Sequence, residues 1–203
     1  MGKLKQPSLK QLRDAAATCR ACELYKRGTQ TVFGAGAARA QVMLIGEQPG
    51  NEEDLAGEPF VGPAGRLLDR ALVEAGIDRK QVYVTNAVKH FKWVARGKRR
   101  IHDKPNAREI AACRPWLDGE FAAVRPKVVV CLGATAAQAL LGRDFRVTKR
   151  RGERIEGTRF AKWVIATVHP SAILRAPDDQ TRRRELARFI DDLRQVQRAV
   201  CSE

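Results

Sequence analysis

Apolar residues gather into four short runs along the chain, separated by amphipathic stretches. The runs are VMLIG (42–46), VYVTNAV (82–88), VVVCLG (128–133) and WVIATVHP (163–170). None of them alternates strictly between apolar and polar residues, which is typical of strands buried on both faces of a sheet. The four runs therefore predict the strands of a central sheet.

Helical periodicity fills the intervals between these runs. In AGRLLDRALVEAG the apolar positions 64, 67, 68, 71, 72 and 75 repeat at helical spacing, and Gly76 follows as a stop signal. Asn106 and Glu109 form a capping pair that opens a helix towards Val124, with a break expected near Pro115. A third helix is predicted over 181–200, where apolar residues share one face.

Strands that alternate with helices indicate an α/β fold. We predict a three-layer sandwich with a central four-stranded, mainly parallel sheet, in a single domain over residues 1–203. Ligands of such sheets bind beyond the carboxyl ends of the strands. Those ends read GEQPG, NAVKH, LGAT and HPSAILR, so Glu47 and His169 stand where chemistry is expected.

The charge of the chain points to a large anionic partner. The formal net charge is +15 and the isoelectric point is near 10.2, which favours nucleic acid first and an anionic membrane surface second. The sequence has no run of about 18 apolar residues and its first residues are polar, which argues against a membrane span and a secretory signal. Five cysteines without such a signal are not expected to form a disulfide framework, so a cytoplasmic protein is expected. The sequence carries no clear signal for an oligomer, so a monomer is expected.

Two strand-end segments carry candidate chemistry. GEQPGNEEDLAGEPFVGPAG (46–65) would hold Glu47 and Gln48 at the sheet edge and turn backbone N–H groups towards a ligand. A phosphate or nucleotide loop is the alternative, but the glycine patterns of those loops are absent. In HPSAILR (169–175), Ser171 and Arg175 lie at a helix start and would suit a phosphate.

Together, GEQPG…EPFVGPAG, TNAVK and HPSAILR resemble the iron–sulfur uracil-DNA glycosylases of the family 4 type, over Cys19 to Arg175. The resemblance implies a uracil-DNA glycosylase-like fold and excision of uracil from DNA, with single-stranded DNA preferred. It implies that Phe60 stacks on uracil and that Asn86 reads N3–H and O4 of the base.

The resemblance also implies the groups that act during bond cleavage. His169 would donate to uracil O2 and stabilise the charge on the departing base. Glu47 would stabilise the cation at C1′ or orient a nucleophile, and Gln48 would assist through its backbone at a uracil carbonyl.

A metal site follows from the same resemblance. Family members ligate an iron–sulfur cluster with four cysteines, of which Cys19, Cys22 and Cys113 are matched here, while His90 stands at the position of the other. We expect a structural [4Fe–4S] cluster with His90 as fourth ligand, because imidazole ligation has precedent. Cys131, in an apolar strand, is the other candidate, and Cys₃His would also suit zinc. The remaining cysteine, Cys201, is interpreted as a thiol of the tail.

The segment FKWVARGKRRIHDKPN (91–106) is an insertion relative to the hydrolytic members of the family. Its KRRIHDKP stretch (98–105) resembles the subgroup called UdgX, whose loop histidine becomes covalently attached to DNA. By this resemblance His102 captures C1′ in place of water, once per molecule. A group held about 3–3.5 Å from C1′ would compete strongly with water, because its effective molarity can be very large.

The basic residues around His102 have two interpretations. Lys98, Arg99, Arg100 and Lys104 either form a solvated loop or hold phosphates beside the abasic sugar, with Arg100 as the preferred anchor. Trp93 could stack on a base. Two other functions stay open: a glycosylase that turns over by hydrolysis, and a non-catalytic iron–sulfur module that binds uracil or abasic DNA.

Overall fold

The computed structural model describes residues 6–201 and contains a six-stranded sheet in the order β1-β3-β2-β6-β8-β7. The four predicted runs form its parallel centre: β2 (Val42–Gly46), β3 (Val82–Asn86), β6 (Val128–Leu132) and β8 (Trp163–Thr167). Two antiparallel edge strands, β1 (Ala35–Gly36) and β7 (Arg154–Ile155), complete the sheet. Each edge strand has two residues, which is too short to show a period in the sequence.

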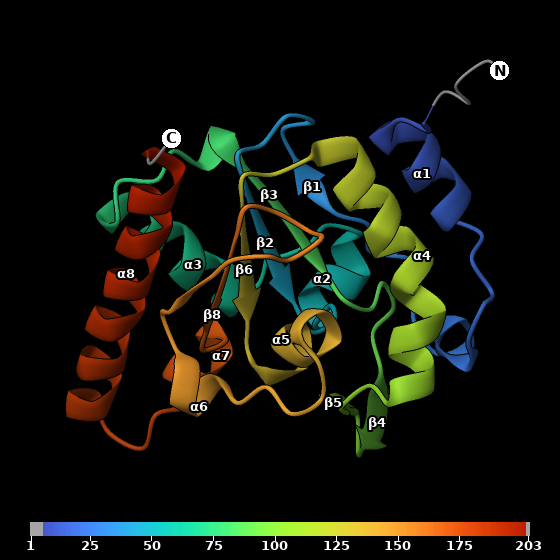
Figure 1. The fold of residues 1–203 in the computed structure, drawn as a ribbon. Helices are drawn as coiled ribbons and strands as arrows, with labels where there is room; N and C mark the ends of the chain where they lie inside the picture. The colour runs from blue at the N-terminus through green and yellow to red at the C-terminus, as the bar shows by residue number, and fades with distance from the viewer. Residues whose placement is uncertain (1–5, 202–203) are drawn as a thin grey trace, which may run out of the picture.

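Helices cover both faces of the sheet and give the predicted three layers (Figure 1). One layer contains α3 (Pro63–Glu74), α7 (Pro170–Leu174) and α8 (Asp179–Cys201), and the other contains α4 (Ala107–Val124) and α5 (Ala134–Leu141). Helix α1 (Leu9–Ala16) packs on the outside of α4. The remaining helical segments are η1 (Glu23–Lys26), α2 (Asn51–Ala56), η2 (Arg79–Gln81) and α6 (Val147–Arg150).

The central strands are buried because both of their faces are covered. In β2, Val42 and Leu44 pack in the cluster that includes α3 and α8, whereas Met43 and Ile45 pack in the cluster that includes α4 and α5. Successive side chains of a strand point to opposite faces, so a doubly covered strand needs apolar residues at every position. This explains the lack of alternation in the four runs.

The break expected near Pro115 is wrong. The helix begins after Asn106, whose capping box with Glu109 is present, and α4 continues through Pro115 to Val124. A proline inside a helix costs about 3 kcal/mol or more. Here Cys113 and Leu117 are buried on either side of the proline, and tertiary packing of α4 outweighs the local cost.

The inserted segment folds as a hairpin and not as an irregular loop. β4 (Trp93–Arg96) pairs with β5 (Arg99–His102), and Gly97 takes a positive φ of 59° in the turn between them. The hairpin lies beyond the carboxyl ends of the sheet strands (Figure 1). His102 is the last residue of β5 and pairs with Trp93.

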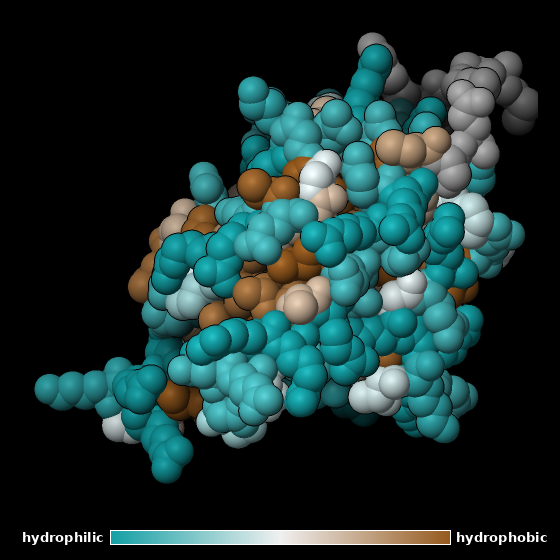
Figure 2. Space-filling model, turned by 90° about the vertical axis from the view of Figure 1, so that its left-hand side faces the viewer, coloured by the Kyte–Doolittle hydropathy of each residue, from teal (hydrophilic) through white to brown (hydrophobic). Residues whose placement is uncertain are grey.

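One side of the surface can be compared with the polar composition. The side of the molecule that carries α8 is mostly hydrophilic, with hydrophobic residues showing between the polar side chains (Figure 2). Within residues 6–201, no helix is long and apolar enough to cross a membrane.

Candidate active site

Three separate elements bring Glu47, Thr135 and His102 together. Glu47 follows β2 directly, Thr135 lies in the first turn of α5, and His102 ends β5. The Thr135 hydroxyl donates to Glu47 Oε2, and His102 Nε2 lies 3.3 Å from Glu47 Oε1. The Glu47 side chain is 22% exposed and the His102 side chain is 49% exposed. The pair is therefore held by the protein on one side and open to a ligand on the other.

The surroundings of Glu47 keep it ionised. Burial alone would raise its pKa, but hydrogen bonds from His102 and Thr135 and the nearby charge of Lys104 outweigh burial and lower the pKa below its ordinary value. A carboxylate at this position can stabilise a positive charge that develops in a substrate.

His169 follows β8 closely and is the N-cap residue of α7. Its Nδ1 accepts from the backbone N–H of Ser171 (3.2 Å) and contacts Ser171 Oγ (2.7 Å). Burial lowers the pKa of His169 to about 4, and the charges of Arg175 and His102 act in the same direction against the opposing effect of Glu47. The ring is therefore neutral at pH 7, and because Nδ1 accepts, Nε2 carries the proton and is a donor.

Phe60 and Asn86 meet over Gly46, the last residue of β2. A Cβ atom at Gly46 would lie 2.3 Å from Asn86 Oδ1 and 2.9 Å from Phe60 Cζ, so only glycine leaves room for both side chains. Phe60 has a positive φ of 59°, which is rare for a bulky residue, and its ring centroid lies 6.0 Å from that of His169. The strained backbone turns the ring towards the other predicted site residues.

The side chain of Gln48 has contacts that our prediction for its backbone did not include. Its side chain closes the base of the hairpin: Nε2 donates to the carbonyls of Lys92 and Asp103, both at 3.0 Å, and Oε1 accepts from Lys92 N at 3.2 Å. These two residues flank the hairpin strands. Gln48 thereby ties His102 to the chain segment that also carries Glu47.

Arg100 is engaged inside the protein, which changes the interpretation of this residue as a phosphate anchor. Its Nη1 lies 2.7 Å from Oδ2 of the fully buried Asp54 and its Nε donates to Asn51 at 2.8 Å. The guanidinium also lies over the rings of Phe91 and Trp93. Trp93 in turn donates its indole N–H to Arg27 O (2.9 Å), so both residues fasten the hairpin to the body of the protein.

The other predicted DNA contacts lie on the surface around the site. Lys98 and Arg99 are exposed at the turn of the hairpin. Lys104 lies just after the hairpin, and its charge helps to lower the pKa of Glu47. Arg175 is exposed at the end of α7, while Ser171 hydrogen bonds with His169. These cations flank the site from two elements.

The predicted metal ligands come from three segments of the chain. Cys19 and Cys22 precede η1, His90 follows β3, and Cys113 lies in α4. Cys22 and Cys113 belong to one small apolar cluster, and Cys19 Sγ accepts from the indole of Trp116 (3.2 Å) in the same cluster. Neighbouring thiols contribute to the raised pKa values of Cys22 and Cys113, although burial is the main cause. Among residues 6–201, no group of three or more Cys, His, Asp or Glu side chains stands in an arrangement that could hold a metal ion.

His90 and Cys131 differ in their suitability as a further ligand. His90 is buried, Nε2 lies 3.1 Å from Thr31 Oγ1, and Nδ1 has no hydrogen-bond partner. An unpartnered buried nitrogen beside a fixed second nitrogen suits a metal ligand. Cys131 lies in the core on β6 in another apolar cluster, where burial raises its pKa to about 12. Cys19, Cys22, Cys113 and His90 are thus donors of the kinds that iron–sulfur clusters use, but among residues 6–201 they do not stand in an arrangement that holds a metal ion.

Two groups near the site escaped the sequence analysis. Thr135 stands in LGAT, one of the strand-end segments, but a threonine at a helix start is common and carried no signal. A buried ion pair, Lys89 with Glu120 (2.6 Å), lies beneath Asn86. Glu120 is 31 residues away from Lys89, so no local pattern could connect them.

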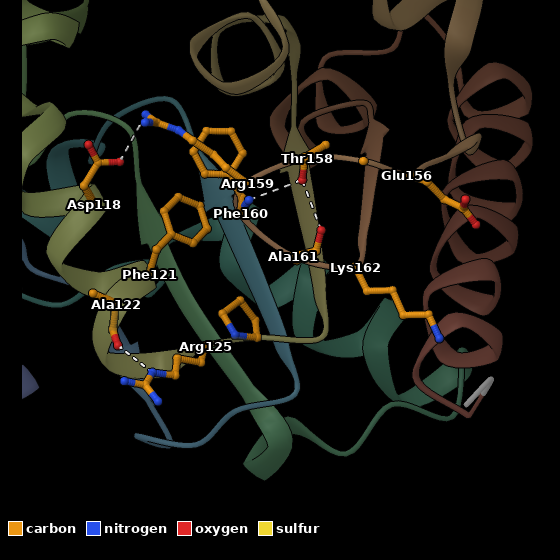
Figure 3. Close-up of a pocket in the computed structure, with 12 residues that line it drawn as sticks. Asp118, Phe121, Ala122, Arg125, Glu156, Thr158, Arg159, Phe160, Ala161 and Lys162 are labelled. Carbon is orange, nitrogen blue, oxygen red and sulfur yellow. Dashed lines mark hydrogen bonds and ion pairs between the residues drawn. The ribbon is translucent and has the colours of Figure 1, made fainter.

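A groove at the opposite end of the sheet contains none of these residues (Figure 3). Its lining comes from the end of α4 and from the segments that precede β6 and β8. In it the ring centroids of Phe121 and Phe160 lie 5.0 Å apart. It therefore lies at the amino ends of the parallel strands, away from Glu47 and His169.

The fold and the site together define an α/β enzyme whose strand-end site suits a planar polar ring, because it brings together an amide, a neutral imidazole donor and an aromatic ring. A carboxylate beside a second imidazole adds groups for acid–base or nucleophilic chemistry. The family model of the uracil DNA glycosylase superfamily matches residues 33–194. The chain belongs to this superfamily.

Curated relatives agree with this assignment. A type-4 uracil-DNA glycosylase of Archaeoglobus fulgidus is 39% identical over 166 residues, covering 79% of this chain and 80% of that protein. A type-4 uracil-DNA glycosylase of Thermotoga maritima is also 39% identical over 166 residues, covering 81% of this chain and 82% of that protein. One of Sulfurisphaera tokodaii is 35% identical over 178 residues, with 84% and 78% covered.

Proposed function

We propose that this protein excises uracil from DNA and that His102 then forms a covalent bond with C1′ of the abasic sugar. The observation that carries the proposal is the 3.3 Å contact between His102 Nε2 and Glu47 Oε1. It links the histidine of the hairpin to the carboxylate that follows β2. A nucleophile and a group that can orient it or accept its proton are thereby placed side by side.

Uracil is recognised by the residues around Gly46. Phe60 stacks on the extruded base, and the Asn86 amide accepts from N3–H and donates to O4, a pattern that cytosine cannot match. His169 donates Nε2–H to O2, since its Nδ1 is occupied by Ser171. Lys98, Arg99, Lys104 and Arg175 contact phosphates that flank the extruded nucleotide.

The reaction breaks the bond between C1′ and N1 of uracil. The bonding electrons leave with the base, and the hydrogen bond from His169 stabilises the negative charge on it. The Glu47 carboxylate stabilises the positive charge on the sugar. A ring nitrogen of His102 donates its lone pair to C1′, and the imidazolium that forms loses its other N–H proton to Glu47 or to water. After losing this proton, the imidazole could leave C1′ only as an imidazolide anion, a poorer leaving group than uracil, so one protein molecule reacts once.

Incubation with a single-stranded oligonucleotide containing one dU tests this function. We expect a protein–DNA band that survives SDS and heating, and released uracil that stops at one equivalent of protein. Free uracil accumulating beyond one equivalent without a band would instead indicate a hydrolytic glycosylase. Absence of both products would leave only a binding module. An oligonucleotide with dC at the same position is the matched control.

We further propose that Cys19, Cys22, His90 and Cys113 bind a [4Fe–4S] cluster with a structural role. The proposal is supported by the unpartnered Nδ1 of His90 and by the gathering of three thiols near η1 and α4. Such a cluster would tie the segment before β1 to α4 and to the turn after β3. The pocket chemistry described above uses none of its electrons.

Metal analysis of the protein purified without oxygen checks the ligand set. We expect iron at about four atoms per chain, as in a [4Fe–4S] centre. His90→Ala should lose most of the iron, because one ligand is removed, whereas Cys131→Ala should retain it as the matched control. Zinc in place of iron would contradict the cluster, and unchanged iron in His90→Ala would exclude His90 as the ligand.

A further inference from the structure

A fully buried ion pair lies directly beneath Asn86, one of the proposed base-reading residues. Lys89 Nζ is 2.6 Å from Glu120 Oε2, and the two side chains are 1% and 0% exposed. Removing two charges from water has a large desolvation cost, so a buried ion pair is weak evidence for a stabilising role. The contacts that this pair makes with the site indicate another role.

The ammonium group of Lys89 uses all three of its donors. Besides Glu120, it donates to Thr85 Oγ1 (2.6 Å) and to the backbone carbonyl of Asn86 (2.8 Å). The third contact reaches the residue that we propose to read the base. Because every donor is satisfied in a buried position, Lys89 has one fixed geometry.

Glu120 is itself held by several donors. Its Oε1 accepts from the backbone N–H of Gly34 and from the Tyr83 hydroxyl, both at 3.0 Å, and from Thr85 Oγ1 at 2.9 Å. The network therefore joins β3 and α4 to the segment before β1. A satisfied buried network of this kind rigidifies the backbone that it contacts.

The peptide of Asn86 is the point where this network reaches the candidate active site. After β3 the chain turns, with Ala87 N donating to Gly46 O (2.9 Å) and Val88 N donating to Glu47 O (3.0 Å). Within residues 6–201, no hydrogen bond holds the side-chain amide of Asn86, which leaves the amide free for a ligand. Its direction is therefore set by the backbone of the turn, which Lys89 holds from below.

We propose that the Lys89–Glu120 pair positions Asn86 for base recognition. The pair fixes the carbonyl of Asn86, and the fixed peptide directs the amide at the uracil edge. This inference rests on the proposed function, in which Asn86 reads uracil. Lys89 and Glu120 touch no substrate, so they act as positioning residues through Asn86.

A double-mutant cycle tests the proposal, with the single-turnover rate of uracil release from a single-stranded dU oligonucleotide as the measurement. We expect Lys89→Met to slow release at least tenfold in the wild-type background. In an Asn86→Ala background the same substitution should change the rate less than twofold, because the amide that Lys89 positions is gone. A merely structural role would give equal factors in both backgrounds.

Two further variants separate positioning from stability. The double variant Lys89→Met with Glu120→Gln leaves no unpaired buried charge. We therefore expect it to fold and still to release uracil slowly. If Lys89→Met alone fails to fold, the double-mutant cycle is run with this double variant instead. Phe121→Ala, in the groove at the opposite end of the sheet, should lower Tm without slowing release. Equal factors in both backgrounds overturn the positioning role and leave uracil excision intact. Wild-type release by Asn86→Ala would remove the base-reading role of Asn86 from the proposed function itself.

Discussion

His102→Ala is expected to abolish the covalent complex with dU-containing DNA completely, while uracil release continues. The remaining groups of the pocket still recognise and expel the base, and water then captures C1′ in place of the imidazole. Release should exceed one equivalent, since nothing retains the protein on the product. Gel analysis in SDS after heating and quantification of free uracil measure the two effects separately.

The fold should be little affected by this substitution. The His102 side chain is 49% exposed, and surface substitutions usually change stability by about 0.5 kcal/mol or less. Arg96→Ala, on the paired strand β4 and also exposed, is the matched control and should keep the band. A heat-stable adduct from His102→Ala would identify a different nucleophile.

Glu47→Gln should slow uracil release about 100- to 1,000-fold. A unit charge about 4 Å from a developing cation contributes about 4 kcal/mol at an effective dielectric constant near 20, and each 1.36 kcal/mol corresponds to about tenfold in rate. Glutamine keeps the size and the hydrogen bond from Thr135 but loses the charge. The single-turnover rate at pH 7 measures the loss.

Thr135→Val provides the comparison for this experiment. It removes the hydroxyl that donates to Glu47 Oε2 but leaves the carboxylate in place, so its effect should be much smaller than that of Glu47→Gln. If Glu47→Gln releases uracil within a few-fold of the wild-type rate, the carboxylate does not stabilise the sugar cation, and the role assigned to it fails.

The centre of the fold could be predicted because each of its features is local. Four runs without alternation correspond to β2, β3, β6 and β8, and the predicted helix after Asn106 begins with the expected capping box. The edge strands were missed because two residues show no period. The continuity of α4 through Pro115 was missed because packing against other elements, and not the local cost of proline, decides whether the helix breaks.

Part of the candidate site could also be predicted from local features of the sequence. Glu47 and His169 were predicted because the carboxyl ends of parallel strands meet at one edge of a sheet, and Asn86 was predicted from the family resemblance. The hairpin was misjudged as a loop, and the side chain of Gln48 received no role. The contacts of Gln48 with Lys92 and Asp103 join residues 44 and 55 positions apart, and no spacing rule reports such pairs.

The sequence by itself determined the layered sheet, the strand-end residues and the histidine among cations. These depend on periodicity and on residue type, which are properties of one segment. Only the tertiary structure decided that Arg100 binds the buried Asp54, that His102 meets Glu47, and that Lys89 pairs with Glu120 beside the backbone of Asn86. The reason is that a charged group binds whatever opposite charge the fold brings within about 4 Å, and this partner depends on the folded backbone and not on distance along the chain.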